Sequence, residues 1–315
     1  MGWVKPLWCA APCAAFVASD ELYPFGSAHV LRLTTRSVAI AVKLRDVPSH
    51  AKIAACQHIA FIGRNAGIFP VRPLRGFINV PATHRMLNNH ELTGRVRTHV
   101  KQYEEPTFAA QPEVAKAFLA MREKARRAGI DLIPYSSFRD FRTQLRIWNG
   151  KFSGKKPLYD MDGRVRDFAS LSELDIIDCI LNWSALPGGS RHQWGTEIDV
   201  IDGASVSPGY VPKLLPEEVS AGGVFEALHH WLDENIAEFG FFRPYASYNG
   251  GMYPEPWHLS FEAASTPALR QVTPELLTAV IRRADMLGKD VVLPLIPQIY
   301  ERHILNINGP GTGQR

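Results

Sequence analysis

The sequence is poor in cysteine and contains no long apolar run. Its 315 residues include four cysteines, at positions 9, 13, 56 and 179. No second Cys/His pair at finger-like spacing follows Cys9 and Cys13, which argues against a structural zinc finger. Cys179 lies in an apolar helical pattern, so we expect a buried free thiol there. No stretch approaches the roughly 18 consecutive apolar residues of a membrane-spanning helix, and we expect no membrane span.

Acidic residues are nearly absent from the first part of the chain. Residues 1–85 hold ten Lys/Arg and three Asp/Glu, whereas the remainder holds 25 basic and 28 acidic residues. The basic excess therefore lies in the N-terminal segment, and the mildly acidic remainder carries no nucleic-acid footprint. A hydrophobic content of 46% is ordinary for a globular protein with a sizeable core.

Residues 1–85 lack a long amphipathic period and do not resemble a domain. We interpret them as a basic N-terminal segment, either a disordered extension or an artefact upstream of a true start at Met86. The first twenty residues faintly resemble a signal peptide, but Pro12 interrupts the apolar run. A start at Met86 predicts a cytoplasmic protein, and export is the less favoured interpretation. The main domain is expected over residues 86–308, followed by a tail at 309–315.

Helical and strand patterns alternate irregularly from Met86 onward. The chain lacks the regular βαβ alternation of a doubly wound fold and contains no internal repeat. We therefore predict an α+β fold with a small, largely antiparallel sheet flanked by helices. Apolar periodicity predicts helices over 112–129, 141–148, 167–183, 224–239, 274–287 and 291–305, and strands over 130–136, 194–201 and, as a hairpin, 241 with 259–261.

Two segments combine residue types that bind zinc. His192 follows a Gly-Ser loop, and Asp199 lies on the expected strand, on the face opposite Ile198. An imidazole and a carboxylate brought to one point suit Zn²⁺ and leave room for a third protein ligand. His258 can supply that ligand, which predicts a His₂Asp site with an open fourth position, as in catalytic zinc sites.

Glu255 stands three residues before His258. Peptide hydrolysis at zinc needs a base beside the metal, and a turning segment with this spacing can place the carboxylate there without ligating. Pro254 and Pro256 exclude a helix, so the helical His-Glu-x-x-His motif does not apply. We therefore predict Glu255 as the general base.

The order of these motifs resembles the VanY/VanX-type zinc D-alanyl-D-alanine carboxypeptidases and dipeptidases, relatives of the hedgehog zinc fold. The similarity rests on His-x₆-Asp, on Glu-x-x-His, on the upstream Ser-x-x-Arg…Gln and on the Pro-Gly-x-Ser-x-His lead-in. It spans about Ser136 to Phe261 and does not reach residues 1–85. The resemblance implies an α+β fold of the DD-peptidase type and a zinc metallopeptidase acting on a small peptide or muropeptide.

The same resemblance implies roles for individual residues. His192, Asp199 and His258 match the zinc ligands, and Glu255 matches the base. Arg139 matches an arginine that stabilises the developing oxyanion. Two further positions, Ser190 and Gln144, match residues that line the substrate subsite.

One position departs from the family pattern, because Glu197 stands where a small residue is usual. It can shape the substrate pocket, pair with Arg191 or Arg139, or lie at the periphery, and it puts the substrate in doubt more than the metal. Two other activities stay open besides a carboxypeptidase: a murein endopeptidase that cuts an internal stem-peptide bond, and a non-catalytic zinc-fold binding module. Glu255 and Arg139 argue against the binding module. The oligomeric state is open.

Overall fold

The computed structural model describes residues 29–33, 38–42 and 85–311. The chain divides into two units, Met1–Val80 and Pro81–Arg315. In the first unit, strands β1 (His29–Leu33) and β2 (Val38–Val42) pair antiparallel. The resemblance to a signal peptide concerns the first twenty residues, which lie outside the described residues. The proposed start at Met86 stays a prediction.

The second unit is built on a four-stranded sheet with the order β5-β6-β8-β7. Each strand pairs antiparallel with its neighbour. A separate hairpin precedes the sheet in the chain. The strands are β3 (Lys101–Glu104) and β4 (Thr107–Ala110) of the hairpin, and β5 (Leu132–Ser136), β6 (Glu197–Asp202), β7 (Phe241–Phe242) and β8 (His258–Phe261) of the sheet.

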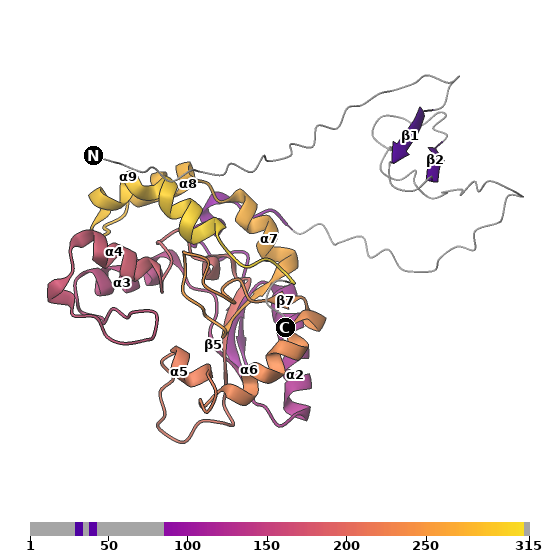
Figure 1. Cartoon of the computed structure of the whole chain (residues 1–315), viewed down its shortest axis with the longest axis horizontal. Coiled ribbons are helices and arrows are strands. Elements are labelled where there is room, and N and C mark those ends of the chain that lie inside the picture. The colour runs from indigo at the N-terminus through magenta and orange to yellow at the C-terminus, as the bar shows by residue number, and fades with distance from the viewer. Residues whose placement is uncertain (1–28, 34–37, 43–84, 312–315) are drawn as a thin grey trace, which may run out of the picture. The chain divides into compact units, whose positions relative to one another are not determined.

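One face of the sheet packs against helices α2 (Pro112–Arg127) and α6 (Glu226–Asn235) (Figure 1). Ile198 and Val200 of β6 share a buried apolar cluster with side chains of both helices. Because successive strand residues point to opposite faces, Glu197 and Asp199 are directed away from this cluster. The polar face of β6 is thus positioned by the packing of its apolar face.

A second apolar core is formed largely by four other helices. It joins α3 (Phe141–Phe152), α4 (Glu173–Leu181), α8 (Pro274–Arg282) and α9 (Lys289–Ile299), which Figure 1 shows close together. The remaining elements are α1 (Asn89–Leu92), α5 (Pro216–Val219), α7 (Glu262–Gln271), the 3₁₀ turns η1 (Phe168–Ser170), η2 (Arg191–Trp194) and η3 (Ile236–Phe239), and the π-helical turn η4 (Tyr300–Leu305).

The predicted α+β class with a small antiparallel sheet and flanking helices is confirmed. Two details differ. The helix expected over 167–183 begins only at Glu173, because Ser172 caps α4 and accepts a hydrogen bond from the Asp175 amide. Helix α7 was not expected, and it carries Pro267 in its interior.

Two smaller expectations concern Cys179 and the membrane. Cys179 is a buried free thiol, as predicted. None of the helices in the described part of the chain has the length and apolar character needed to cross a bilayer.

Candidate active site

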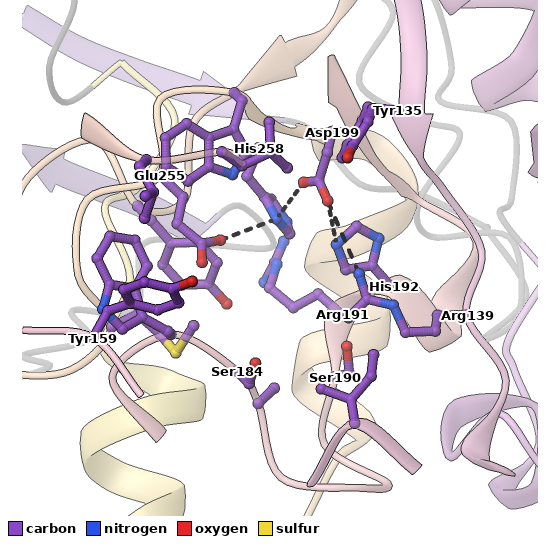
Figure 2. Close-up of a pocket in the computed structure, with 18 of the residues that line it drawn as sticks. Tyr135, Arg139, Tyr159, Ser184, Ser190, Arg191, His192, Asp199, Glu255 and His258 are labelled. Carbon is purple, nitrogen blue, oxygen red and sulfur yellow. Dashed lines mark ion pairs between the residues drawn. The ribbon is translucent and has the colours of Figure 1, made fainter. Parts of the chain in front are cut away.

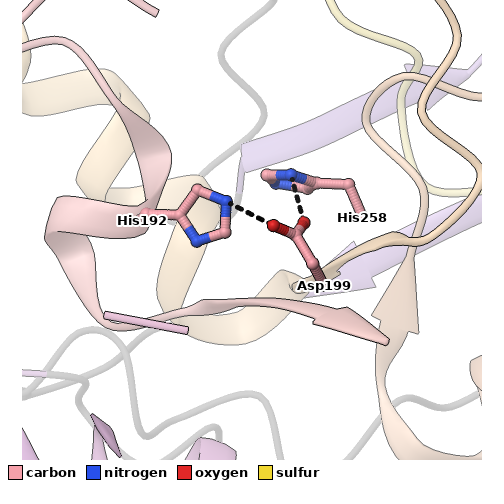
Figure 3. A group of neighbouring side chains, drawn as sticks. All are labelled: His192, Asp199 and His258. Carbon is pink, nitrogen blue, oxygen red and sulfur yellow. Dashed lines mark ion pairs between the residues drawn. The ribbon is translucent and has the colours of Figure 1, made fainter. Parts of the chain in front are cut away.

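Two of the predicted metal ligands are cross-strand partners. In the antiparallel pairing of β6 with β8, Asp199 stands opposite His258. Such partners have Cβ atoms only about 5 Å apart, so the register alone brings the carboxylate to the imidazole. In the part of the chain that the structure describes, His192, Asp199 and His258 form the one buried group whose ligand atoms, all within 4.8 Å of one another, can hold a metal ion (Figure 3).

His192 reaches this group from the turn η2. Its Nδ1 lies 2.8 Å from the carbonyl oxygen of Ser137, which leaves Nε2 facing Asp199 Oδ2 at 3.3 Å. Gly195 ends η2 with a φ of 68°, and a Cβ there would lie 2.2 Å from a methyl group of Val100. Only glycine fits this turn between His192 and β6.

Glu197 is the departure from the family pattern, and the structure places it behind the candidate metal ligands. Its Oε2 accepts a hydrogen bond of 2.8 Å from His258 Nε2, and its Oε1 lies 3.2 Å from Arg191 Nη2. Glu197 is fully buried and does not line the cavity described below. Of the three placements considered for it, the pairing with Arg191 is the one observed.

The hydrogen bond to Glu197 fixes which ring atom of His258 faces the other ligands. Its Nδ1 lies 3.1 Å from Asp199 Oδ1. Both atoms are buried, and neither has a hydrogen-bond partner among the described residues. A metal-binding histidine is commonly held in this way, through a carboxylate on its other ring nitrogen.

Charged neighbours favour the ionised form of two buried carboxylates, Asp199 and Glu197. Burial opposes the charge of Asp199, but the neighbouring imidazoles outweigh it and hold its pKa well below the usual range. Burial likewise opposes the charge of Glu197, and Arg191 with His258 lowers its pKa to about 2. Burial lowers the pKa of His192. For His258, burial is outweighed by the surrounding carboxylates, and its pKa is raised well above the ordinary value.

The three candidate ligands line a cavity of about 410 Å³ together with Glu255. Glu255 Oε2 lies 3.5 Å from His258 Nδ1, and Figure 2 shows its carboxylate facing the group of His192, Asp199 and His258. The carboxylate thus borders the ligand group and remains in contact with the cavity. Tyr245 also lines the cavity and packs its ring against His258.

Arg139 lines the same cavity and is held by several partners. Its Nη2 donates to Ser136 Oγ at 3.0 Å and lies 4.0 Å from Asp199 Oδ2, while its Nη1 donates to Gln144 Oε1 at 2.9 Å. Gln144 is fully buried, and its Nε2 donates to the carbonyl oxygen of Ala185. Both ends of the Gln144 amide are therefore used inside the protein, and Gln144 is not among the cavity-lining residues. This placement gives no support to the predicted substrate-lining role of Gln144.

Ser190 is among the residues that line the cavity, and several other lining residues were not anticipated. Figure 2 shows Ser184 near Ser190 on one side of the pocket and Tyr159 on another. Lys151, in the last turn of α3, also lines the cavity. The sequence could have indicated this place, because Lys151 lies seven residues after Gln144 and four after Ile147. These spacings put the three side chains on one face of the helix.

Comparison with protein families points to the same family as the motifs in the sequence. The model of the family VanY, D-alanyl-D-alanine carboxypeptidase, matches residues 108–264. Two curated proteins of Haemophilus influenzae, each named "Uncharacterized protein", are similar to this chain. One is 33% identical over 122 residues, 38% of this chain and 93% of its own length. The other is 38% identical over 100 residues, 30% of this chain and 67% of its own length.

The chain is also similar to several solved structures, two of which follow. The first is VanYB in complex with D-alanine-D-alanine, at 20% identity and a TM-score of 0.39, covering 65% of this chain and 93% of that one. The second is a mutant of the vancomycin resistance D,D-pentapeptidase VanY in complex with Zn(II), at 22% identity and a TM-score of 0.38, covering 54% of this chain and 83% of that one.

The fold and the site define an α+β protein with a buried His₂Asp group at the wall of a cavity. The chain belongs to the VanY-like family of D-alanyl-D-alanine carboxypeptidases. It is therefore a peptidase.

Proposed function

We propose that this protein is a zinc metallopeptidase that hydrolyses a peptide bond near the C terminus of a small peptide. The observation that carries the proposal is the convergence of His192, Asp199 and His258 in the wall of a cavity that also contains Glu255. The family supports the reaction class, and this geometry supports the assignment of metal and base.

The residues fit a zinc ion. Two imidazole nitrogens and a carboxylate oxygen are a donor set typical of catalytic zinc, and three protein ligands leave a position for water or substrate. The buried atoms Asp199 Oδ1 and His258 Nδ1 lack hydrogen-bond partners among the described residues, which a metal ion would satisfy. Ser137 and Glu197 hold the outer nitrogens of the two rings. A zinc ion held by His192, Asp199 and His258 would supply Lewis-acid polarisation of the scissile carbonyl and acidify a coordinated water molecule.

Glu255 takes the role of the general base. Its carboxylate borders the ligand group and lines the cavity, and its backbone amide donates to the Tyr245 carbonyl oxygen at 2.9 Å. A carboxylate held there accepts a proton from the attacking water and returns it to the leaving amine. A site without turnover would have no use for a base in this position.

Arg139 takes the role of the oxyanion partner. Its guanidinium is held by Ser136 and Gln144 and lines the cavity beside Asp199. A positive group that is already positioned where negative charge develops stabilises the transition state, because no side chain has to move during the reaction. Gln144 fits this account as a residue that positions Arg139, and Ser190 as one that contacts the peptide.

The substrate class that we propose is a peptidoglycan-derived peptide ending in D-Ala-D-Ala. The test is to incubate zinc-loaded protein with a muropeptide that ends in D-Ala-D-Ala and to identify the products by mass spectrometry. Release of free D-alanine is the expected result. Larger fragments alone would show an endopeptidase, and an unchanged muropeptide would contradict the proposed substrate.

A further inference from the structure

Lys151 is a cation in the active-site cavity that lacks an anionic partner. It lies in the last turn of α3 and lines the cavity with the candidate metal ligands and Glu255. Its Nζ donates a hydrogen bond of 2.7 Å to Ser184 Oγ. Among the described residues, no carboxylate lies within ion-pair distance of Lys151.

The other cations of the cavity differ from Lys151. Arg191 is paired with a buried glutamate, and Arg139 is held beside Asp199. Lys156 and Lys213 are exposed to water, and Lys213 also lies 3.7 Å from a glutamate of α5. Lys151 is thus the one of these five cations that is half-buried and has no carboxylate within ion-pair distance among the described residues.

This arrangement leaves the ammonium group poorly compensated in the free enzyme. Removing a charge from water is costly unless a partner replaces the lost solvation, and one neutral hydroxyl replaces only part of it. Burial accordingly lowers the pKa of Lys151 to about 8. An anion that enters the cavity would restore the missing interaction, so the site is prepared for a ligand with negative charge.

The neighbours of Lys151 indicate where on a peptide that charge lies. Ile147, one helical turn earlier, and Ala185, next to Ser184, are apolar lining residues that suit a small side chain. Ser184 and Ser190 add hydroxyl groups on the same side of the pocket (Figure 2). A cation, hydroxyl groups and a small apolar surface together match the last residue of a peptide, with its free carboxylate and a methyl side chain.

We propose that Lys151 binds the C-terminal carboxylate of the substrate and thereby restricts the enzyme to exopeptidase cleavage. The inference rests on the proposed function, because it assumes a peptide in this cavity. It assigns the terminal-residue subsite to Lys151 and Ser184, from α3 and the end of the α4 region. An internal peptide bond, which presents no carboxylate at that place, would be cleaved poorly.

The test compares two peptides that differ only at the end. An N-acylated peptide ending in D-Ala-D-Ala and its C-terminal amide are given to zinc-loaded wild type, Lys151→Met and Lys151→Arg. Lys155→Met is the matched control, since Lys155 is exposed four residues away and does not line the cavity. The wild type should prefer the acid, and K151M should raise KM for the acid by about ten- to a hundredfold, the range expected for losing a charge-assisted hydrogen bond.

Three features of the result separate the possible explanations. The kcat of K151M for the acid and its rate on the amide should stay within a few-fold of wild type, and K151R should keep part of the preference. Equal cleavage of acid and amide by the wild type, or an undiminished preference in K151M, would overturn the role of Lys151 and leave the zinc peptidase standing. No zinc-dependent cleavage of either peptide by the wild type would instead contradict the proposed function and this inference with it.

Discussion

The carboxylate of Glu197 accepts the Nε2 proton of His258 over 2.8 Å and so turns Nδ1 of that ring towards Asp199. The two residues lie on neighbouring strands, with Glu197 two positions before the residue that pairs with His258. The glutamate therefore acts through the histidine and has no contact with the cavity. It links the sheet register to the orientation of a candidate metal ligand.

Glu197→Gln should weaken zinc binding about 10- to 100-fold, the usual effect of removing the outer partner of a metal-binding histidine. The amide loses the negative charge that raises the basicity of the ring. Competition with a chromogenic chelator measures the change, on protein whose folding is checked by circular dichroism. Glu104→Gln, at an exposed position of β3, is the control and should leave the affinity unchanged. Equal affinities of E197Q and wild type would show that Glu197 does not support the metal site.

Arg191→Met should destabilise the metal-free protein by about 3–5 kcal/mol, because it leaves a buried carboxylate without its charge partner. Arg191 is 3% exposed and Glu197 is 0% exposed. The double variant R191M/E197Q should be more stable than the sum of the single changes predicts, since no unpaired charge remains. Urea unfolding measures all three. Additive effects would contradict a coupled buried pair.

Glu255→Gln should lower kcat by about 10²- to 10⁴-fold, the range for loss of a general base. Zinc affinity should change little, because Glu255 lies beside the ligand group and is not a member of it. Steady-state kinetics and metal analysis are both needed. Glu173→Gln, exposed at the start of α4, serves as the matched control. Loss of zinc from E255Q would make Glu255 a ligand, and retained turnover would assign the base elsewhere.

The KM for a peptide with a free C terminus should rise as the pH increases through about 8. Burial lowers the pKa of Lys151 to about 8, with Arg139 and Lys156 adding to the shift and Glu255 opposing it. Lys151 is protonated below that pH and neutral above it, so the proposed carboxylate contact weakens on the alkaline side. The difference in KM between the acid and the amide peptide isolates this effect. A difference that stays constant from pH 7 to 9 would contradict it.

Local pattern was sufficient to predict the strand that carries Asp199. Alternation along the strand predicted Asp199 on the face opposite Ile198, and the same rule groups Val200 with Ile198 and Glu197 with Asp199. In the structure the apolar pair is in the core, and the two carboxylates lie on the face that bears the site. The start of the strand was wrong by three residues, because Trp194 belongs to the turn η2 that Gly195 ends.

Long-range relationships could not be predicted in the same way. The pairing of Asp199 with His258 depends on a register between segments almost sixty residues apart, which no local period encodes. Helix α7 buries small residues, Ala264, Ser265 and Ala268, and so lacks a strong apolar period. Lys151 resembles an ordinary helical surface lysine until the fold brings Ser184 to its side chain.

The central claim is that a single zinc ion at His192, Asp199 and His258 enables peptide hydrolysis. The most direct measurement removes metal by chelation and then titrates zinc back, while release of D-alanine from a D-Ala-D-Ala peptide is followed. The account predicts no turnover in the metal-free protein and a rise to a plateau at one equivalent of zinc. Undiminished turnover in verified metal-free protein would contradict it.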